Sequence, residues 1–260
     1  MKPLLLLLFL LVADSAHAQI VNTQPLLSKI EEDGFSGEVR TTFEWRTGNV
    51  DLLRLSATAL FAWRADEHAL VSSSSVDFGQ TGDGERYLFR TFSHLRYQGR
   101  ISPLVTWEAY GQVAHDEFRR INVRALGGTG PRWTLSYGER GRERGRLRLG
   151  TAYMLEHERY SESPTLADGG RTRLNHRASF YLDGRYSPED NVALQATIYY
   201  QPRLDAWAED WLLHAEAQVA VRITDALALT FALVLAYDTS PPDTVVDLDA
   251  STTAGISVAF

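Results

Sequence analysis

Charged side chains recur at every second position through much of the sequence, and this spacing determines what they could do together. Residues two apart in a strand share a face, so these arginines, carboxylates and one histidine are expected on one side of a sheet. Such a face could line a narrow water path and select small solutes by charge, or its members could pair and plug the space. The candidate lumen-lining residues are Arg40, Glu44, Arg54, Arg90, His94, Arg96, Glu108, Arg124, Arg148, Arg173, Arg177, Glu216 and Arg222.

Catalysis by a serine hydrolase would need a serine beside a histidine on the same face. Ser93 adjoins His94, but neighbours on a strand point to opposite faces. His176 and Ser179 are three residues apart and also face opposite ways. We therefore predict no catalytic residues and no enzyme, with a lipid-modifying outer-membrane hydrolase kept as an alternative.

Metal-binding side chains are grouped in three places, none with a recognisable ligand spacing. We expect the histidine clusters to lie in solvated loops, and the aspartates lack the spacing of a calcium loop. No metal site and no cofactor are predicted. The groups are Glu156-His157-Glu158, His115-Asp116-Glu117, and the set Asp238, Asp243, Asp247 and Asp249.

Strands must position the charged face, because apolar and polar residues alternate with period two from about Gly34 onward. In the segment Val39–Trp45, for example, the apolar residues are at odd positions and the charged residues at even ones, with threonines at 41 and 42. Phe92 falls on the polar face of its strand. The facing of the serines at 72–75 is ambiguous, and glycines predict a bulge or bend in Val123–Trp133.

Turn signals divide the chain at eleven places and so predict twelve strands. The spacing suits membrane strands of about 10 residues with turns. Counted from a periplasmic amino terminus, Ser187–Asp190 and Thr224-Asp225 are short inner turns, and Ser161–Gly170 and Asp238–Asp247 are long outer loops. Gly138–Gly145 is long for an inner turn.

The fold class expected from this pattern is all-β, a transmembrane antiparallel up-and-down barrel of about twelve strands. Aromatic residues on the apolar face cluster near strand ends, as in the interfacial girdles of membrane barrels. Aromatics are also favoured in any sheet, and a soluble periplasmic barrel or sandwich that buries its apolar face stays open as an alternative. The girdle candidates are Trp45, Trp63, Tyr87, Tyr97, Trp211, Tyr237 and Phe260.

The two ends of the chain favour the membrane alternative. Residues 1–18 contain a lysine, an apolar run and a small-x-small cleavage site, which is the pattern of a secretory signal peptide. Residues 19–33 form an amino-terminal periplasmic segment, and 34–260 form the barrel. The last strand alternates and ends on Phe260. We expect the barrel-insertion machinery to bind this strand, and the outer membrane of a Gram-negative bacterium to be the destination.

Composition excludes several other classes. The net charge of −7 argues against nucleic acid as a partner. The chain has no cysteine, so it forms no disulfide and carries no amino-terminal lipid. The most apolar mature segment, Ala226–Tyr237, is 12 residues long, and a membrane helix needs about 20.

Three stretches resemble the YdiY-like family, salt-induced outer-membrane proteins of unknown function. The chain shows a strand from Gly37, a Thr47-Gly48-Asn49 turn and a second strand. A glycine-rich strand follows at Arg124–Gly130, and Tyr237–Pro242 precedes a polar loop and a final strand. The resemblance implies an outer-membrane barrel and brings no catalytic residues.

Taken together, these features predict an outer-membrane barrel that acts as a small passive pore or in envelope maintenance. The structural alternative is a closed barrel whose outer loops bind lipopolysaccharide or a partner protein. Outer-membrane lipids and lipopolysaccharide are the expected surroundings in either case. The charged face is central to both alternatives, since it either lines the pore or plugs it.

Overall fold

The computed structural model describes residues 33–139, 142–224 and 227–258, which form one antiparallel sheet of twelve strands. The predicted signal peptide, the segment 19–33 except for its last residue, and Phe260 lie outside the described residues. The strands are β1 (Gly34–Arg46), β2 (Leu52–Ala65), β3 (His68–Thr81), β4 (Arg86–Arg100), β5 (Val105–Asp116), β6 (Ile121–Glu139), β7 (Arg142–Tyr160), β8 (Thr172–Tyr186), β9 (Val192–Pro202), β10 (Trp211–Arg222), β11 (Leu227–Asp238) and β12 (Leu248–Val258).

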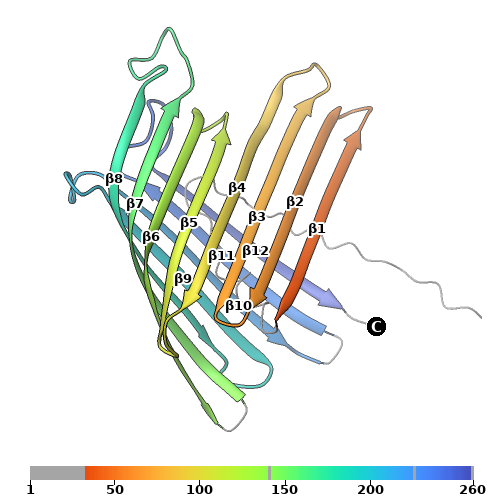
Figure 1. Ribbon diagram of the computed structural model, residues 1–260. Helices are drawn as coiled ribbons and strands as arrows, with labels where there is room; N and C mark the ends of the chain where they lie inside the picture. Colours follow the sequence, from red (N-terminus) through yellow and green to blue (C-terminus); the bar gives the residue numbers. More distant parts are fainter. Residues whose placement is uncertain (1–32, 140–141, 225–226, 259–260) are drawn as a thin grey trace, which may run out of the picture.

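Each strand pairs with the next strand along the chain, from β1 to β12. The predicted up-and-down order of twelve antiparallel strands is confirmed. Figure 1 shows the sheet curled, so that β9–β12 pass behind β1–β5. Among the described residues, no ladder joins the two edge strands β1 and β12.

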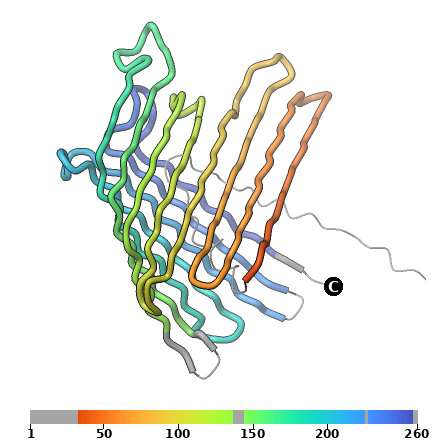
Figure 2. The backbone as a smooth tube through the Cα atoms, in the orientation of Figure 1, coloured from red at the N-terminus to blue at the C-terminus, as the bar shows by residue number. Residues whose placement is uncertain are grey.

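The connections differ in length between the two ends of the sheet. At one end, the long-loop end, the connections span residues 47–51, 82–85, 117–120, 161–171, 203–210 and 239–247. At the other, the short-turn end, they span 66–67, 101–104, 140–141, 187–191 and 223–226. The connection between β7 and β8 projects beyond the strands in Figure 2. The prediction of a long connection at Gly138–Gly145 is wrong, because β6 runs to Glu139 and β7 begins at Arg142.

The two faces of the sheet are inverted relative to a soluble protein. On β7, Leu147, Leu149 and Leu155 are 43%, 46% and 39% exposed on the convex face, whereas Glu156 on the concave face is 1% exposed. Strand alternation produces this separation, since successive side chains point to opposite faces. The buried set is mostly polar or charged. Within the described residues, no helix is long and apolar enough to span a membrane.

The structure resolves two segments for which the sequence pattern was ambiguous, the serines of β3 and the glycine-rich part of β6. In β3, Ser73 and Asp77 are buried on the concave face, and Ser74 on the convex face contacts Ser93 of β4. The glycine-rich part of β6 keeps one register with β7 from Val123 to Trp133, and the register shifts lie nearer the ends of β6, at Ile121/Val123 and Tyr137/Gly138. The expected irregularity therefore borders the run Val123–Trp133 and does not interrupt it. A glycine is needed instead where the backbone of β7 comes close to Gly130 of β6.

Candidate functional site

Glu108 on β5 is the acceptor at the middle of the concave face. Its carboxylate accepts hydrogen bonds from Arg96 Nη1 at 3.3 Å, Gln98 Nε2 at 2.8 Å, Arg132 Nη1 at 2.8 Å and Tyr181 Oη at 2.8 Å. All five side chains are buried. Four donors from three other strands satisfy the charge that burial would otherwise destabilise. We call these residues the central cluster.

Strand register and two glycines bring the central cluster together. Gln98 lies directly opposite Glu108 in the β4–β5 ladder. Tyr181 comes from β8, three strands away, and its ring lies over Gly150, where a Cβ atom would collide with the ring. A Cβ at Gly130 of β6 would meet the backbone of β7. The missing side chains on β6 and β7 let the tyrosine reach across them to the carboxylate.

A small cavity borders the central cluster on the side of His94. The His94 ring stacks between Phe92 and Tyr110, with centroids 6.3 Å and 6.0 Å away. The Arg96 guanidinium lies 5.1 Å from the Tyr110 ring. Neither ring nitrogen of His94 has a hydrogen-bond partner among the described residues. The cavity of about 30 Å³ beside it has room for a water molecule that would satisfy one of them.

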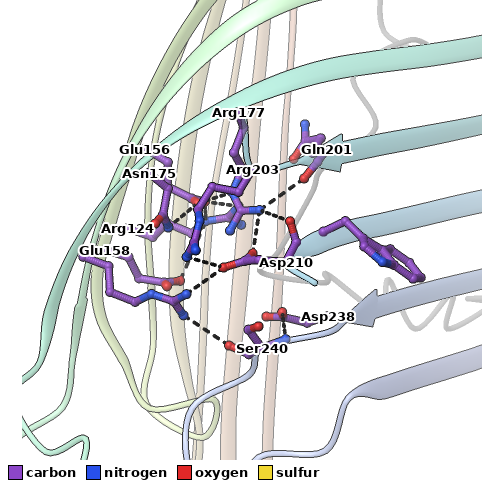
Figure 3. Close-up of polar contacts among 12 residues, drawn as sticks. Arg124, Glu156, Glu158, Asn175, Arg177, Gln201, Arg203, Asp210, Asp238 and Ser240 are labelled. Atoms are coloured by element: carbon purple, nitrogen blue, oxygen red, sulfur yellow. Dashed lines mark hydrogen bonds and ion pairs between the residues drawn. The ribbon is translucent and has the colours of Figure 1, made fainter. Parts of the chain in front are cut away.

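A second cluster lies toward the long-loop end and centres on Glu156 of β7. Arg124 Nε donates to Glu156 Oε1 at 2.5 Å, and Arg177 Nε and Asn175 Nδ2 donate to Oε2 at 2.7 Å and 3.1 Å. Glu156, Arg124, Arg177 and Asn175 are each at most 3% exposed. Figure 3 shows them converging from neighbouring strands. Two guanidinium groups around one carboxylate leave this group of charges paired rather than isolated.

The loop between β9 and β10 adds a carboxylate to this cluster. Asp210 accepts from Arg173 Nη2 at 2.7 Å and Arg203 Nη1 at 2.8 Å, and it lies 2.9 Å from Arg177 Nη1. Because Arg177 contacts both Glu156 and Asp210, strands and loop form one network, visible in Figure 3. We call this network, with Arg124 and Asn175, the outer cluster.

Loops at the long-loop end are tied to one another by Asp168. Its carboxylate accepts from Arg120 Nη2 and from the backbone N–H of Asp243, each at 2.7 Å. Arg120 Nη1 also donates to the carbonyl of Asp243 at 2.7 Å. Burial opposes ionisation of Asp168, but the donors from Arg120 and Asp243 outweigh it and lower the pKa of this carboxyl. Three separate connections are thus held by one ionised group.

The concave face is uneven around its circumference. The central and outer clusters cover β4–β8, whereas small side chains lie on the concave face at the middle of β2, β11 and β12. Ser56 and Thr58 on β2, Thr230 on β11 and Thr253 on β12 are all partly exposed. We call the first part the charged wall and the second the small-residue wall. Water can reach the small-residue wall, while the charged wall is packed against itself.

Comparison with protein families identifies the chain. Residues 41–260 match the family model described as protein of unknown function, DUF481. The chain belongs to the DUF481 family. The match covers nearly all of the sheet of this DUF481 protein, including both clusters. No curated protein matches its sequence.

Solved structures similar to this DUF481 protein share very little sequence with it. The NanC porin is 7% identical with a TM-score of 0.46, over 87% of this chain and 99% of that one. The CymD monoaromatic hydrocarbon channel is 10% identical with a TM-score of 0.41, over 91% and 82%. The translocator domain of the autotransporter NalP from Neisseria meningitidis is 10% identical with a TM-score of 0.40, over 91% and 92%. At these identities, no ligand or activity carries over to the DUF481 chain.

The thirteen lumen-lining candidates all lie at concave-face positions of the DUF481 sheet, but their surroundings differ. Arg40 on the edge strand β1 and Arg222 at the short-turn end are exposed. Glu44, Arg54, Arg90, Arg173 and Glu216 are partly exposed. The fully buried candidates are His94, Arg96, Glu108, Arg124, Arg148 and Arg177.

The expected separation of serines from histidines is confirmed. Ser93 lies on the convex face, where it contacts Ser74, while His94 is buried on the concave face. His176 contacts the Tyr153 hydroxyl at 2.6 Å on the convex face, and Ser179 is buried on the other side. That the protein is not an enzyme stays a prediction.

The expectation that Glu156, His157 and Glu158 lie in a solvated loop is wrong. They belong to β7, and alternation sends both glutamates inward and His157 outward. Asp116 is likewise buried at the end of β5, where it accepts two backbone N–H groups. Among the residues that the structure describes, no three histidines or carboxylates lie close enough to hold a metal ion.

Several members of the clusters were not among the candidates. Period-two spacing from Arg124 and Arg148 would have included Arg132 and Glu156. Asp210 lies in a loop, where no periodic signal exists. The cluster members missed are Gln98, Arg132, Glu156, Asn175, Tyr181, Arg203 and Asp210, and Tyr110 and Asp183 were missed beside them.

Proposed function

We propose that this DUF481 protein is an outer-membrane barrel of a Gram-negative bacterium that acts as a narrow passive pore. The observation that carries the proposal is the inversion of the two faces, with apolar residues exposed and charged residues buried. The YdiY-like resemblance within the family fits the same location. The proposed surroundings are outer-membrane lipids and lipopolysaccharide, and the insertion machinery would bind the carboxy-terminal strand. No enzymatic reaction is assigned.

The convex face supports a lipid environment. Exposed apolar side chains run along strands on both sides of the curled sheet, for example Leu149 on β7 and Phe231 on β11. Monomeric soluble proteins rarely expose large contiguous apolar patches. Four of the aromatic candidates, Trp45, Tyr87, Trp211 and Tyr237, lie near the long-loop end, and Trp63 and Tyr97 lie near the other. Aromatic side chains at two levels of the barrel match the two headgroup layers of a membrane.

A lipid environment also requires that the sheet be closed. Each unpaired backbone N–H or C=O group on β1 and β12 would destabilise the folded protein by several kcal/mol in hydrocarbon. We therefore propose that β1 pairs with β12 in the membrane. The chain has no cysteine, so a disulfide between Thr42→Cys on β1 and Thr253→Cys, or a neighbouring concave-face position of β12, would report closure directly.

The passage would follow the small-residue wall. The side chains of the charged wall are held together by buried ion pairs, so they give the lumen charge but leave no room there for a passing solute. Opposite it, the side chains of Ser56, Thr58, Thr230 and Thr253 are short and partly exposed. Glu216 is the candidate between the two walls, with its side chain 31% exposed and 2.7 Å from His214. Its charge would therefore act on passing ions.

Planar-bilayer conductance of the refolded protein tests the pore. We expect small, steady channels, and the variant Glu216→Gln should shift ion selectivity away from cations. Glu162→Gln is the matched control, because it removes the same charge from the exposed loop 161–171. Absence of channels in repeated insertions would refute the pore and favour the closed barrel that binds lipopolysaccharide through its loops. Turnover of phospholipid or lipid A would favour the hydrolase instead.

A further inference from the structure

A basic cavity lies at the short-turn end, next to the central cluster, with which it shares Gln98 and Arg132. Its volume is about 260 Å³, and its lining carries five arginines against two carboxylates, a net charge of +3. We call it the basic vestibule. Its charged lining residues are Arg64, Arg100, Arg132, Arg146 and Arg148, with Asp66 and Glu67.

Successive strands deliver these arginines to one place. Arg64 lies near the end of β2, Arg100 is the last residue of β4, Arg132 is in β6, and Arg146 and Arg148 lie near the start of β7. All five have even residue numbers, and the even positions of these strands face the concave side. Within the described residues, the turns between these strands are short at this end, and no long loop covers the guanidinium groups. The described part of the chain therefore leaves the vestibule open to solutes from the short-turn end.

The acidic residues nearby do not neutralise the vestibule. Glu67 pairs with Arg100 at the rim. Deeper in the barrel, Glu108 pairs with Arg132 at 2.8 Å and Asp183 with Arg148 at 3.6 Å. Arg64 has no ion pair within the described part of the chain. With Glu108 and Asp183 counted beside Asp66 and Glu67, the five arginines still exceed the four carboxylates by one positive charge.

Two buried N–H groups beside the vestibule have no acceptor. Neither Arg64 Nε nor Arg132 Nε finds a hydrogen-bond partner among the described residues. An unsatisfied buried donor destabilises a protein by about 1–3 kcal/mol, and more when it is charged. A carboxylate or phosphate group satisfies guanidinium donors in pairs, through two parallel hydrogen bonds.

We propose that the basic vestibule binds a small solute carrying two or more carboxylate or phosphate groups. Several guanidinium groups around one cavity match a multivalent anion better than a single charge, and they repel cations. The site goes beyond the pore proposal, because a closed barrel would bind the same anion from the short-turn end. The conductance experiment can therefore refute the pore without refuting anion binding, and the binding experiment can refute anion binding without refuting the pore.

Isothermal titration calorimetry of the refolded full chain in zwitterionic detergent tests the site. Citrate is the carboxylate probe, pyrophosphate is the phosphate probe, and acetate is the monovalent control. We expect saturable binding of citrate or pyrophosphate and none of acetate. Arg64→Gln should weaken binding by about tenfold or more, because it removes one charge-assisted fork.

The matched control is Arg159→Gln, which removes the same charge from an exposed position at the long-loop end. It should bind as wild type does. If Arg64→Gln fails to refold, Arg64→Lys keeps the charge without the fork and should bind more weakly than wild type. Absence of saturable heat with both probes would overturn the proposal. So would equal weakening by Arg64→Gln and Arg159→Gln, since attraction would then be a property of overall charge.

Discussion

Removing the charge of Glu156 should destabilise the barrel more than any exposed carboxylate would. The variant Glu156→Gln keeps the size of the side chain but leaves two buried guanidinium groups without their shared anion. Breaking a buried ion pair by removing one partner destabilises proteins by about 3–5 kcal/mol. Arg177 keeps Asp210 at 2.9 Å, and Arg124 keeps Glu158 at 4.0 Å. We therefore expect the lower end, about 3 kcal/mol, which exceeds a hundredfold change in the folding equilibrium.

Urea titration in phospholipid vesicles, followed by tryptophan fluorescence, measures this loss. Glu67→Gln is the control, because Glu67 pairs with Arg100 at a rim where both side chains are about half exposed. Exposed pairs contribute about 0–1 kcal/mol, so its midpoint should barely move. A loss below about 1 kcal/mol for Glu156→Gln would refute the reasoning, since the network would then be solvated rather than buried.

A double variant separates lost charge from lost packing. Replacing both Arg124 and Glu156 by methionine removes one positive and one negative charge together, and Arg177 still has Asp210. Buried pairs replaced by apolar residues are often neutral in stability. The double variant should therefore be more stable than Glu156→Gln. If instead the losses simply add, the two side chains do not act as a pair.

The remaining predictions concern the convex face, the loops and the central cluster. Leu149→Arg should destabilise the barrel by about 2–4 kcal/mol in vesicles, whereas a soluble protein would tolerate it at a position 46% exposed. The pKa of Asp168 is lowered on folding, so its contribution to stability is complete above the unfolded pKa of about 4 and is lost as pH falls through the lower folded value. The variant Asp168→Asn should therefore remove the part of the urea midpoint that depends on acid pH. A pH profile of the midpoint equal to that of wild type would contradict this prediction. Gly150→Val should displace the Tyr181 ring and destabilise by about 1–3 kcal/mol, while a wild-type urea midpoint would show that the ring has room.

Most of the fold could be predicted because strand alternation is a local property. The charged residues of β4, such as Arg90 and Arg96, alternate with Leu95 and Tyr97, and this pattern determines which side of the sheet each occupies. Turn signals gave the number of strands for the same reason. The break at Gly138–Gly145 was predicted in the right place but too long, because its glycines and charged residues pair within the hairpin and the strands end at Glu139 and Arg142.

The clusters could not be predicted in the same way, because they depend on distances between strands that are far apart in sequence. Tyr181 reaches Glu108 across 73 positions, and only the absence of a side chain at Gly150 makes room for it. Asp210 comes from a loop, where sequence spacing carries no information on direction. Local periodicity assigns a face to each residue, but it does not assign a partner.

The paired charges give the barrel a register that its apolar face cannot provide. A slip of β5 by one residue would turn Glu108 toward lipid, as it would for any alternating strand. A slip by two residues keeps every face correct, and lipid contacts barely change. It would, however, move Glu108 away from Gln98, which lies directly opposite, and would break its contacts to Arg132 and Tyr181. Because leaving a buried carboxylate without donors is so unfavourable, the central cluster selects between registers that hydrophobicity treats alike.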